Sequence, residues 1–218
     1  MEVISATDVA GSAAAVLEAA LHERLASASR ASLALSGGST PWQAVERLAG
    51  VDLAWDRVDV FQVDERVAPA GDPARNAVEL EARLLSRTQA MAHLMPVERT
   101  DLDQAVADYA ARLPPTLDVV QLGLGADGHT ASLVPGDPVL DVEDDDVGVT
   151  GEYRGNRRMT LTYPAINRAG LIVWIVTGAE KREAVRALLR GDPDIPAGRI
   201  RADRAVLVAD RAALGEDA

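Results

Sequence analysis

The hydrophobic positions along the chain follow two patterns, short continuous runs typical of buried strands and wider spacings typical of amphipathic helices. The runs, with one alternating segment, predict strands at residues 3–4, 31–35, 58–63, 93–95, 117–122, 159–162, 171–176 and 205–209. Helical spacing predicts helices at residues 9–28, 41–50, 77–87, 101–113, 179–190 and 210–214. Because helices connect most successive strands, we expect an α/β fold with a doubly wound, mostly parallel sheet and helices on both faces, in three layers.

The length and composition indicate one large globular domain that spans residues 1–218. Hydrophobic residues make up 48% of the chain and charged residues 26%, which are ordinary values for a globular protein. No internal repeat or low-complexity linker divides the sequence, and 218 residues suffice to bury a substantial core. We expect a monomer or a small homo-oligomer.

The charge and the absence of cysteine limit the classes of partner and chemistry. The formal net charge of −12 argues against nucleic acid or an anionic membrane as the main partner, although a small anionic ligand remains compatible with it. Without cysteine, a disulfide framework, a thiolate nucleophile and a zinc-thiolate site are excluded. The N-terminus lacks the features of a signal peptide, and no apolar run reaches membrane-spanning length. These features predict a cytoplasmic protein.

A glycine-rich turn after the strand at residues 31–35 forms a candidate anion site. In this turn, Ser39 or Thr40 is expected to cap the next helix, and Pro41 to occupy its first position; the turn reads Ser36-Gly37-Gly38-Ser39-Thr40-Pro41. Free backbone N–H groups and the positive end of the helix dipole favour an anion such as phosphate there. A plain capped helix without a ligand accounts for the turn equally well.

Two further groups of charged residues also follow predicted strands. Asp64-Glu65-Arg66 come directly after residues 58–63, where either a ligand site or a local ion pair would explain them. Lys181 is the only lysine among 22 basic residues and lies in the first turn of the predicted helix at 179–190. A cation there opposes the helix dipole unless an anion lies between them, which favours a phosphate ligand.

The loop after the strand at residues 117–122 carries the candidate acid and base groups. It contains Gly123, Gly125, Asp127, Gly128 and His129, and a short helix-compatible segment follows, ended by Pro135-Gly136. An ordinary turn with a solvated histidine is the alternative. Ligands of parallel sheets bind beyond the carboxyl ends of the strands, so we expect the four candidate segments to converge there. The acidic run at 141–146 lacks the spacing of a metal site and is expected to be solvated.

Five segments of the sequence, in order, resemble the 6-phosphogluconolactonase family, which shares a doubly wound fold with glucosamine-6-phosphate deaminase. They are residues 35–41, 64–66, 123–133, 158–162 and 178–181, of which Asp-Gly-His-Thr-Ala-Ser-Leu at 127–133 is the most specific. The resemblance implies hydrolysis of 6-phospho-D-glucono-1,5-lactone to 6-phosphogluconate in the oxidative pentose phosphate pathway, with no metal or organic cofactor. The chain departs from the family pattern at Val134, usually phenylalanine, and at Arg75, commonly serine.

The resemblance also implies roles for individual residues. His129 is the expected general base that activates water, and Asp127 is the carboxylate that orients it. Backbone N–H groups of residues 123–128 are candidate oxyanion donors, and Ser132 is a weaker candidate nucleophile. The residues expected to bind the phosphorylated sugar lactone are Ser36, Gly37, Gly38, Ser39, Thr40, Asp64, Arg66, Gly125, Arg158 and Lys181.

Two alternative functions share the same phosphate site. A glucosamine-6-phosphate deaminase-like isomerase would need several carboxylates, including a glutamate shortly after the loop histidine, but no carboxylate lies between His129 and Asp137. A non-catalytic sugar-phosphate-binding domain would have no need of an acid–base pair, but Asp127 and His129 are both present. The sequence therefore favours the lactonase.

Overall fold

The structure is a computed structural model that describes residues 1–216, so residues 217–218 of the predicted domain lie outside the described residues. Its main sheet has seven strands in the order β1-β10-β9-β6-β2-β3-β5, and every neighbouring pair is parallel. The strands are Glu2–Ser5 (β1), Ala31–Leu35 (β2), Val58–Gln62 (β3), Met91–His93 (β5), Val119–Leu122 (β6), Leu171–Val176 (β9) and Ala205–Ala209 (β10). The predicted parallel α/β sheet is confirmed.

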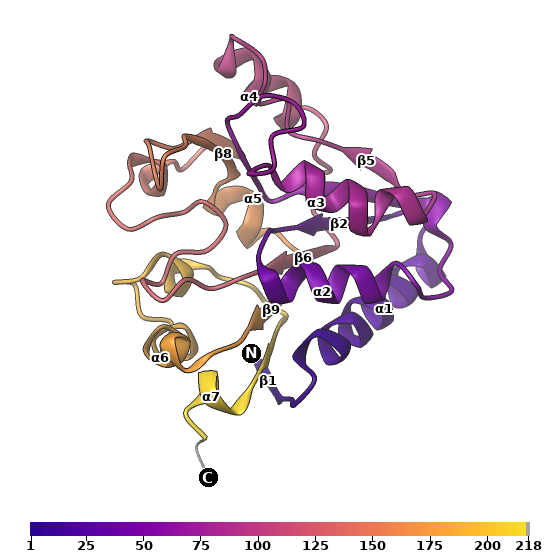
Figure 1. Ribbon diagram of the computed structural model, residues 1–218, viewed down its shortest axis with the longest axis vertical. Helices are drawn as coiled ribbons and strands as arrows, with labels where there is room; N and C mark the ends of the chain where they lie inside the picture. The colour runs from indigo at the N-terminus through magenta and orange to yellow at the C-terminus, as the bar shows by residue number, and fades with distance from the viewer. Residues whose placement is uncertain (217–218) are drawn as a thin grey trace.

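Helices cover both faces of this sheet, as predicted. They are Val9–Ser27 (α1), Ser39–Leu48 (α2), Asn76–Arg83 (α3), Leu102–Ala110 (α4), Tyr163–Asn167 (α5), Arg182–Arg190 (α6) and Arg211–Leu214 (α7). Figure 1 shows α1 and α2 side by side, with α6 and α7 across the sheet from them. Both faces of β9 are buried, which explains its continuous apolar run. Ile172 and Trp174 pack into one core, and Val173 and Ile175 pack into the other.

No helix within residues 1–216 is both long and apolar enough to cross a membrane.

A second, antiparallel sheet was not predicted. It has the order β4-β8-β7, formed by Asp64–Arg66 (β4), Arg158–Leu161 (β8) and Val147–Val149 (β7). Val63 joins the two sheets, because its N–H donates to Leu35 O at 2.9 Å while its carbonyl accepts from Leu161 N at 2.8 Å. The pairing makes Arg66 and Arg158 cross-strand neighbours, although 92 positions separate them in the chain.

The predicted helix-compatible segment after His129 does not form a helix. Thr130 and Leu133 form an isolated bridge, and Ala131 has a φ of 52°. Two hydroxyls of this segment bond elsewhere: Thr130 Oγ1 donates to Gly123 O at 2.8 Å and Ser132 Oγ to Asp64 Oδ2 at 2.6 Å. Side-chain bonds of this kind compete with the helical pattern, so the segment remains an irregular loop.

Other boundaries differ by a few residues. The predicted strand at 93–95 lies at Met91–His93, and the predicted helix at 77–87 ends at Arg83, before a short 3₁₀ turn at Leu85–Arg87. The remaining 3₁₀ turns are Trp55–Arg57, Pro138–Asp141, Ala179–Lys181 and Pro196–Arg199.

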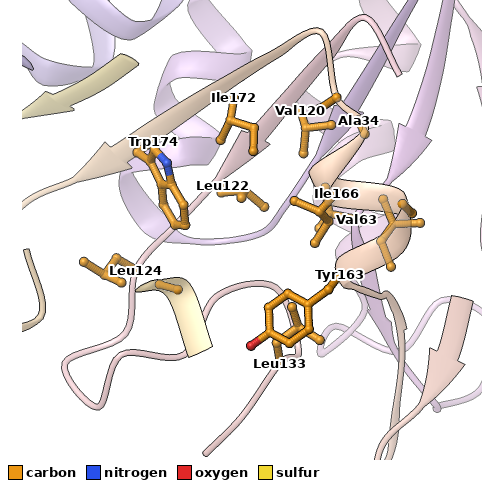
Figure 2. Close-up of a cluster of buried hydrophobic side chains, with 14 of the residues drawn as sticks. Ala34, Val63, Val120, Leu122, Leu124, Leu133, Tyr163, Ile166, Ile172 and Trp174 are labelled. Atoms are coloured by element: carbon orange, nitrogen blue, oxygen red, sulfur yellow. The ribbon is translucent and has the colours of Figure 1, made fainter. Parts of the chain in front are cut away.

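Two buried leucines fix the ends of the loop that carries Asp127 and His129. Leu124 is 7% exposed and Leu133 is fully buried, and both belong to the core cluster in Figure 2, with Leu122, Trp174 and Tyr163. Burying a leucine contributes about 2 kcal/mol, so each end of the loop is held by the core. The loop itself follows β6. After β6 the next strand of the main sheet is β9, toward one edge, whereas after the neighbouring β2 it is β3, toward the other edge. Such a divergence point is where ligands bind in this class of fold.

Candidate active site

A cavity of about 380 Å³ lies beyond the carboxyl ends of β2, β6 and β9. Its lining includes His129 and all ten residues expected to bind the substrate. The expected convergence of the four candidate segments is therefore present in the structure. Asp127 does not line the cavity and contacts the imidazole of His129. Arg157, the neighbour of Arg158 in the chain, lies outside the lining and donates to Thr150 O at 3.4 Å.

The turn after β2 forms one wall, but its helix cap differs from the prediction. Helix α2 begins at Ser39, its N-cap is Gly38, and no side chain caps it. Gly38 has a φ of 136°, which a residue with a β-carbon rarely adopts, so the chain turns there rather than at Ser39 or Thr40. Thr40 Oγ1 instead bonds Thr177 Oγ1 at 2.8 Å. Without a side-chain cap, the first N–H groups of α2 stay available to an anion.

The base of this turn is rigid. The amide of Ser36 donates to Gln121 Oε1 at 3.1 Å, and the Gln121 amide donates to Ser36 Oγ at 3.3 Å. Gly37 lies against Asn76, because a β-carbon at position 37 would lie 2.3 Å from Asn76 Oδ1. The turn is therefore fixed before any ligand binds, which lowers the entropic cost of binding one.

Cations gather at the same end of the cavity. Arg158 is 8% exposed, and its Nε has no hydrogen-bond partner within residues 1–216. Burial lowers the pKa of Arg158, and the nearby Asp64 carboxylate opposes that effect. Lys181 lies in the 3₁₀ turn just before α6, rather than inside its first turn, and forms no ion pair within residues 1–216. A buried donor without a partner is costly, so Arg158 is suited to receive an anionic ligand.

Of the three residues Asp64-Glu65-Arg66, Glu65 is structural, and Asp64 and Arg66 line the cavity. Glu65 is fully buried and accepts hydrogen bonds from the Gln62 side chain and from the backbone N–H groups of Arg66, Asn76 and Ala77. Arg75, the departure noted in the sequence, pairs with Glu65 at 3.4 Å and so completes this buried cluster. Arg66 donates to Asn76 Oδ1, and both Asp64 and Arg66 line the cavity.

Ser132 and Val134 are both buried outside the cavity lining. Because the Ser132 hydroxyl donates to Asp64, it is poorly placed as a nucleophile. Val134 contributes to packing next to the loop and does not shape the cavity wall.

His129 and Asp127 form a close pair, and His129 lines the cavity. His129 Nδ1 lies 2.5 Å from Asp127 Oδ1, which also accepts the His129 backbone N–H at 3.2 Å. Partial burial raises the pKa of Asp127, but these bonds from His129 outweigh it and hold the pKa below its usual value. His129 Nε2 has no hydrogen-bond partner within residues 1–216. The arrangement leaves Nε2 as the nitrogen able to accept a proton.

Gly125 leaves room for the His129 imidazole and does not offer its backbone N–H as an oxyanion donor. Its N–H donates to His129 O at 2.8 Å, and a β-carbon at position 125 would lie 2.0 Å from His129 Nδ1. The N–H groups of Leu124 and Ala131, which also line the cavity, have no acceptor within residues 1–216 and are the better oxyanion candidates.

Tyr153 and Arg154 also line the cavity, and neither was predicted from the sequence. The Tyr153 hydroxyl donates to Asp127 Oδ2 at 3.1 Å, and its ring meets the His129 ring edge-on with centroids 5.7 Å apart. Burial raises the pKa of Tyr153, and the charge of Asp127 adds to the effect, so the hydroxyl keeps its proton. The dipeptide Arg154-Gly155 indicates a tight turn, but nothing local indicates that this turn reaches Asp127.

Among residues 1–216, no three histidine, cysteine, aspartate or glutamate side chains cluster so as to hold a metal ion.

Comparisons with known proteins identify the family of the chain and its fold. A family model described as glucosamine-6-phosphate isomerases/6-phosphogluconolactonase matches residues 4–209. The 6-phosphogluconolactonase of Mesorhizobium japonicum is 38% identical over 202 residues, covering 88% of this chain and 83% of that protein. The one from Nostoc sp. is 37% identical over 178 residues, covering 76% and 74%. The crystal structure of 6-phosphogluconolactonase from Leishmania guyanensis has a TM-score of 0.85, with 27% identity and 97% of each chain covered.

Proposed function

Because the chain belongs to the family of glucosamine-6-phosphate isomerases and 6-phosphogluconolactonases, we propose that it is an enzyme that hydrolyses 6-phospho-D-glucono-1,5-lactone to 6-phosphogluconate. This reaction is a step of the oxidative pentose phosphate pathway. The resemblance of the sequence to the family is confirmed by the family model and by relatives of that name.

One observation carries the assignment to the lactonase. A single cavity is lined by an imidazole with a free nitrogen and by a cluster of anion-binding groups, formed by the turn at 36–40, Arg66, Arg158 and Lys181. The substrate has a phosphate at one end and a reactive ester carbonyl at the other, and the cavity offers a partner for each. Its volume of about 380 Å³ is within the range of small-molecule sites.

The reaction follows from these positions. A water molecule attacks the lactone carbonyl carbon while its proton passes to His129 Nε2, which Asp127 orients through Nδ1. The carbonyl oxygen gains negative charge and is stabilised by the N–H groups of Leu124 and Ala131. The bond between the carbonyl carbon and the ring oxygen then breaks, and that oxygen takes the proton from His129. The new carboxylic acid releases a proton to water and leaves as a carboxylate.

The phosphate contacts position the substrate for this step. A lactone already opens slowly in water, so fixing it beside one base supplies a large part of the acceleration required. Arg158 and Arg66 reach the cavity from paired strands β8 and β4, whereas Lys181 comes from the segment after β9. Three cations on three separate segments define the position of a phosphate better than a single flexible side chain would.

The same proposal extends to the domain, the compartment and the assembly. The match to residues 4–209 and the position of the cavity beyond the main sheet support one lactonase-like domain over 1–218. A cytoplasmic location and a monomer or small homo-oligomer remain predictions from the sequence.

The decisive experiment compares the purified protein with His129→Ala in a coupled assay. Phosphogluconolactone is generated freshly, 6-phosphogluconate is measured as it forms, and spontaneous opening is subtracted. We expect the variant to lose more than about 100-fold in kcat while its fold and its affinity for 6-phosphogluconate stay close to wild type. A variant with wild-type turnover would refute the general-base assignment.

A parallel assay with glucosamine 6-phosphate tests the deaminase alternative. Release of ammonia at a rate above the lactonase rate would replace the proposed function by that alternative. A protein that binds 6-phosphogluconate but turns over neither substrate would instead be a sugar-phosphate-binding domain.

A further inference from the structure

We propose that Tyr153 is a positioning residue of the lactonase reaction, and the proposal rests on the function inferred above. Its hydroxyl holds the Asp127 carboxylate in the orientation that Asp127 needs to direct His129. Tyr153 Oη donates to Asp127 Oδ2 at 3.1 Å, and His129 Nδ1 lies 2.5 Å from Oδ1. Each carboxylate oxygen therefore has its own partner, so rotation of the carboxylate would break both contacts.

Asp127 needs such a contact because it is poorly enclosed. Its side chain is 41% exposed on an irregular loop, whereas the His129 side chain is 20% exposed. Water competes for an exposed carboxylate, and a side chain with two free χ angles loses its orientation easily. Apart from His129, Tyr153 is the only residue within 1–216 whose side chain bonds the Asp127 carboxylate.

The hairpin that carries Tyr153 is well defined. Tyr153 and Asn156 exchange backbone hydrogen bonds at 3.0 and 3.4 Å around a two-residue turn. Both central residues have positive φ, 53° for Arg154 and 84° for Gly155, as tight hairpin turns require. At the base of the hairpin, Thr150 N donates to Arg158 O at 2.8 Å. The backbone thus fixes where the tyrosine ring enters the site.

The Tyr153 ring also contacts His129 and two cations of the cavity lining. The guanidinium groups of Arg154 and Arg158 each lie 5.0 Å from the Tyr153 ring centroid, and the His129 ring meets Tyr153 edge-on. Guanidinium groups over an aromatic face are favourable, so the ring packs against these cations while its hydroxyl bonds the carboxylate. Loss of the hydroxyl alone leaves this packing in place.

The proposal predicts which kinetic constant changes. When Asp127 accepts the Nδ1 proton, Nε2 is the basic nitrogen of the imidazole. Without the tyrosine hydroxyl, the carboxylate rotates and the imidazole populates the other tautomer, whose Nε2 carries the proton and accepts none from water. We expect Tyr153→Phe to lower kcat about tenfold and to change KM by less than about twofold.

Tyr163→Phe is the matched control. The Tyr163 hydroxyl donates to Pro196 O at 3.0 Å, and the Arg199 guanidinium lies 4.8 Å from the Tyr163 ring centroid. Tyr163 therefore makes the same two kinds of contact as Tyr153, a hydroxyl hydrogen bond and a guanidinium over the ring, but it does not line the cavity. This variant should keep the wild-type kcat. A second readout is the ¹⁵N spectrum of the imidazoles, because the chain has three histidines and the His129 signals are those missing in His129→Ala. We expect one tautomer of His129 in wild type and a mixture in Tyr153→Phe.

The outcomes are distinct. A fall in kcat confined to Tyr153→Phe, with a mixed tautomer, supports the proposal. An unchanged kcat and an unchanged tautomer overturn it, and so does a raised KM at constant kcat, since Tyr153 would then contact substrate instead of Asp127. A wild-type protein without lactonase activity overturns the proposed function, and the spectrum, which needs no turnover, still decides whether Tyr153 orients the pair.

Discussion

Gly125 offers a sharp test of how the loop places His129. A β-carbon at position 125 would lie 2.0 Å from His129 Nδ1, 2.3 Å from its Cε1 and 2.4 Å from Asp127 Oδ1. Ordinary contacts begin near 3.4 Å, so Gly125→Ala must displace the imidazole, or the loop, by about 1.4 Å. The φ of Gly125 is not positive, so alanine at this position meets a steric conflict with the pair rather than backbone strain.

The size of the effect follows from that displacement. Moving a catalytic group by about 1 Å costs about 100-fold in rate, equivalent to about 2.7 kcal/mol of transition-state stabilisation. We therefore expect the kcat of Gly125→Ala to fall about 100-fold. The KM should change less than about threefold, because the atoms nearest to a β-carbon at position 125 belong to His129 and Asp127 and not to the expected phosphate-binding residues. The coupled lactonase assay measures both constants, and thermal unfolding reports whether the variant is folded.

Gly123→Ala adds the same methyl group to the same loop without the conflict. The nearest heavy atom to a β-carbon at position 123 is Gly37 O at 3.8 Å, which is an ordinary contact. This variant should keep most of its turnover. If folded Gly125→Ala matched wild type in kcat, the imidazole would not lie against residue 125 during turnover, and the geometry assigned to His129 would be wrong.

Two further predictions concern the phosphate and a carboxylate remote from the cavity. Lys181→Ala should raise KM for the phosphorylated lactone at least about tenfold more than for glucono-1,5-lactone, and equal effects in the two assays would remove Lys181 from the phosphate site. The hydrogen bond from Arg30, followed by that of His93, holds the pKa of Asp59 in the folded protein below its value in the unfolded chain. The ionised Asp59 therefore stabilises the fold above the unfolded pKa, and this stabilisation is lost as the pH falls through the folded pKa. Asp59→Asn should therefore lower the thermal midpoint by about 3 °C at pH 7 and by progressively less below about pH 4; a constant difference would contradict the shift.

The convergence of the site was predictable from the sequence because parallel sheets impose it. Residues that follow parallel strands emerge at one edge, so placing Ser36, Asp64, Gly125 and Lys181 after predicted strands was enough to place them together. The continuous apolar run of β9 gave a strand with correct bounds for the same reason, since both of its faces are buried.

Features that depend on distant partners were not predictable in the same way. Ser39 and Thr40 are good capping residues, yet the left-handed φ of Gly38 moved the start of α2 and left Thr40 to bond Thr177. The small antiparallel sheet arises from pairings between β4 and β8 that no local pattern encodes. Tyr153 was not predicted as a site residue because its contact with the site is a hydrogen bond to Asp127, which lies 26 positions away in the chain.

The charge of the whole chain and the charge of the cavity lining have opposite signs. A ligand in the cavity interacts mainly with the charge of the lining. The chain has a formal net charge of −12, but the cavity lining holds four cations, Arg66, Arg154, Arg158 and Lys181, and two carboxylates, Asp64 and Glu180. Interactions between exposed charges fade beyond about 8 Å at physiological salt, so a bound phosphate responds mainly to the lining. The distant acidic surface therefore has little effect on an anion in the cavity, and the charges of the lining favour a phosphorylated ligand.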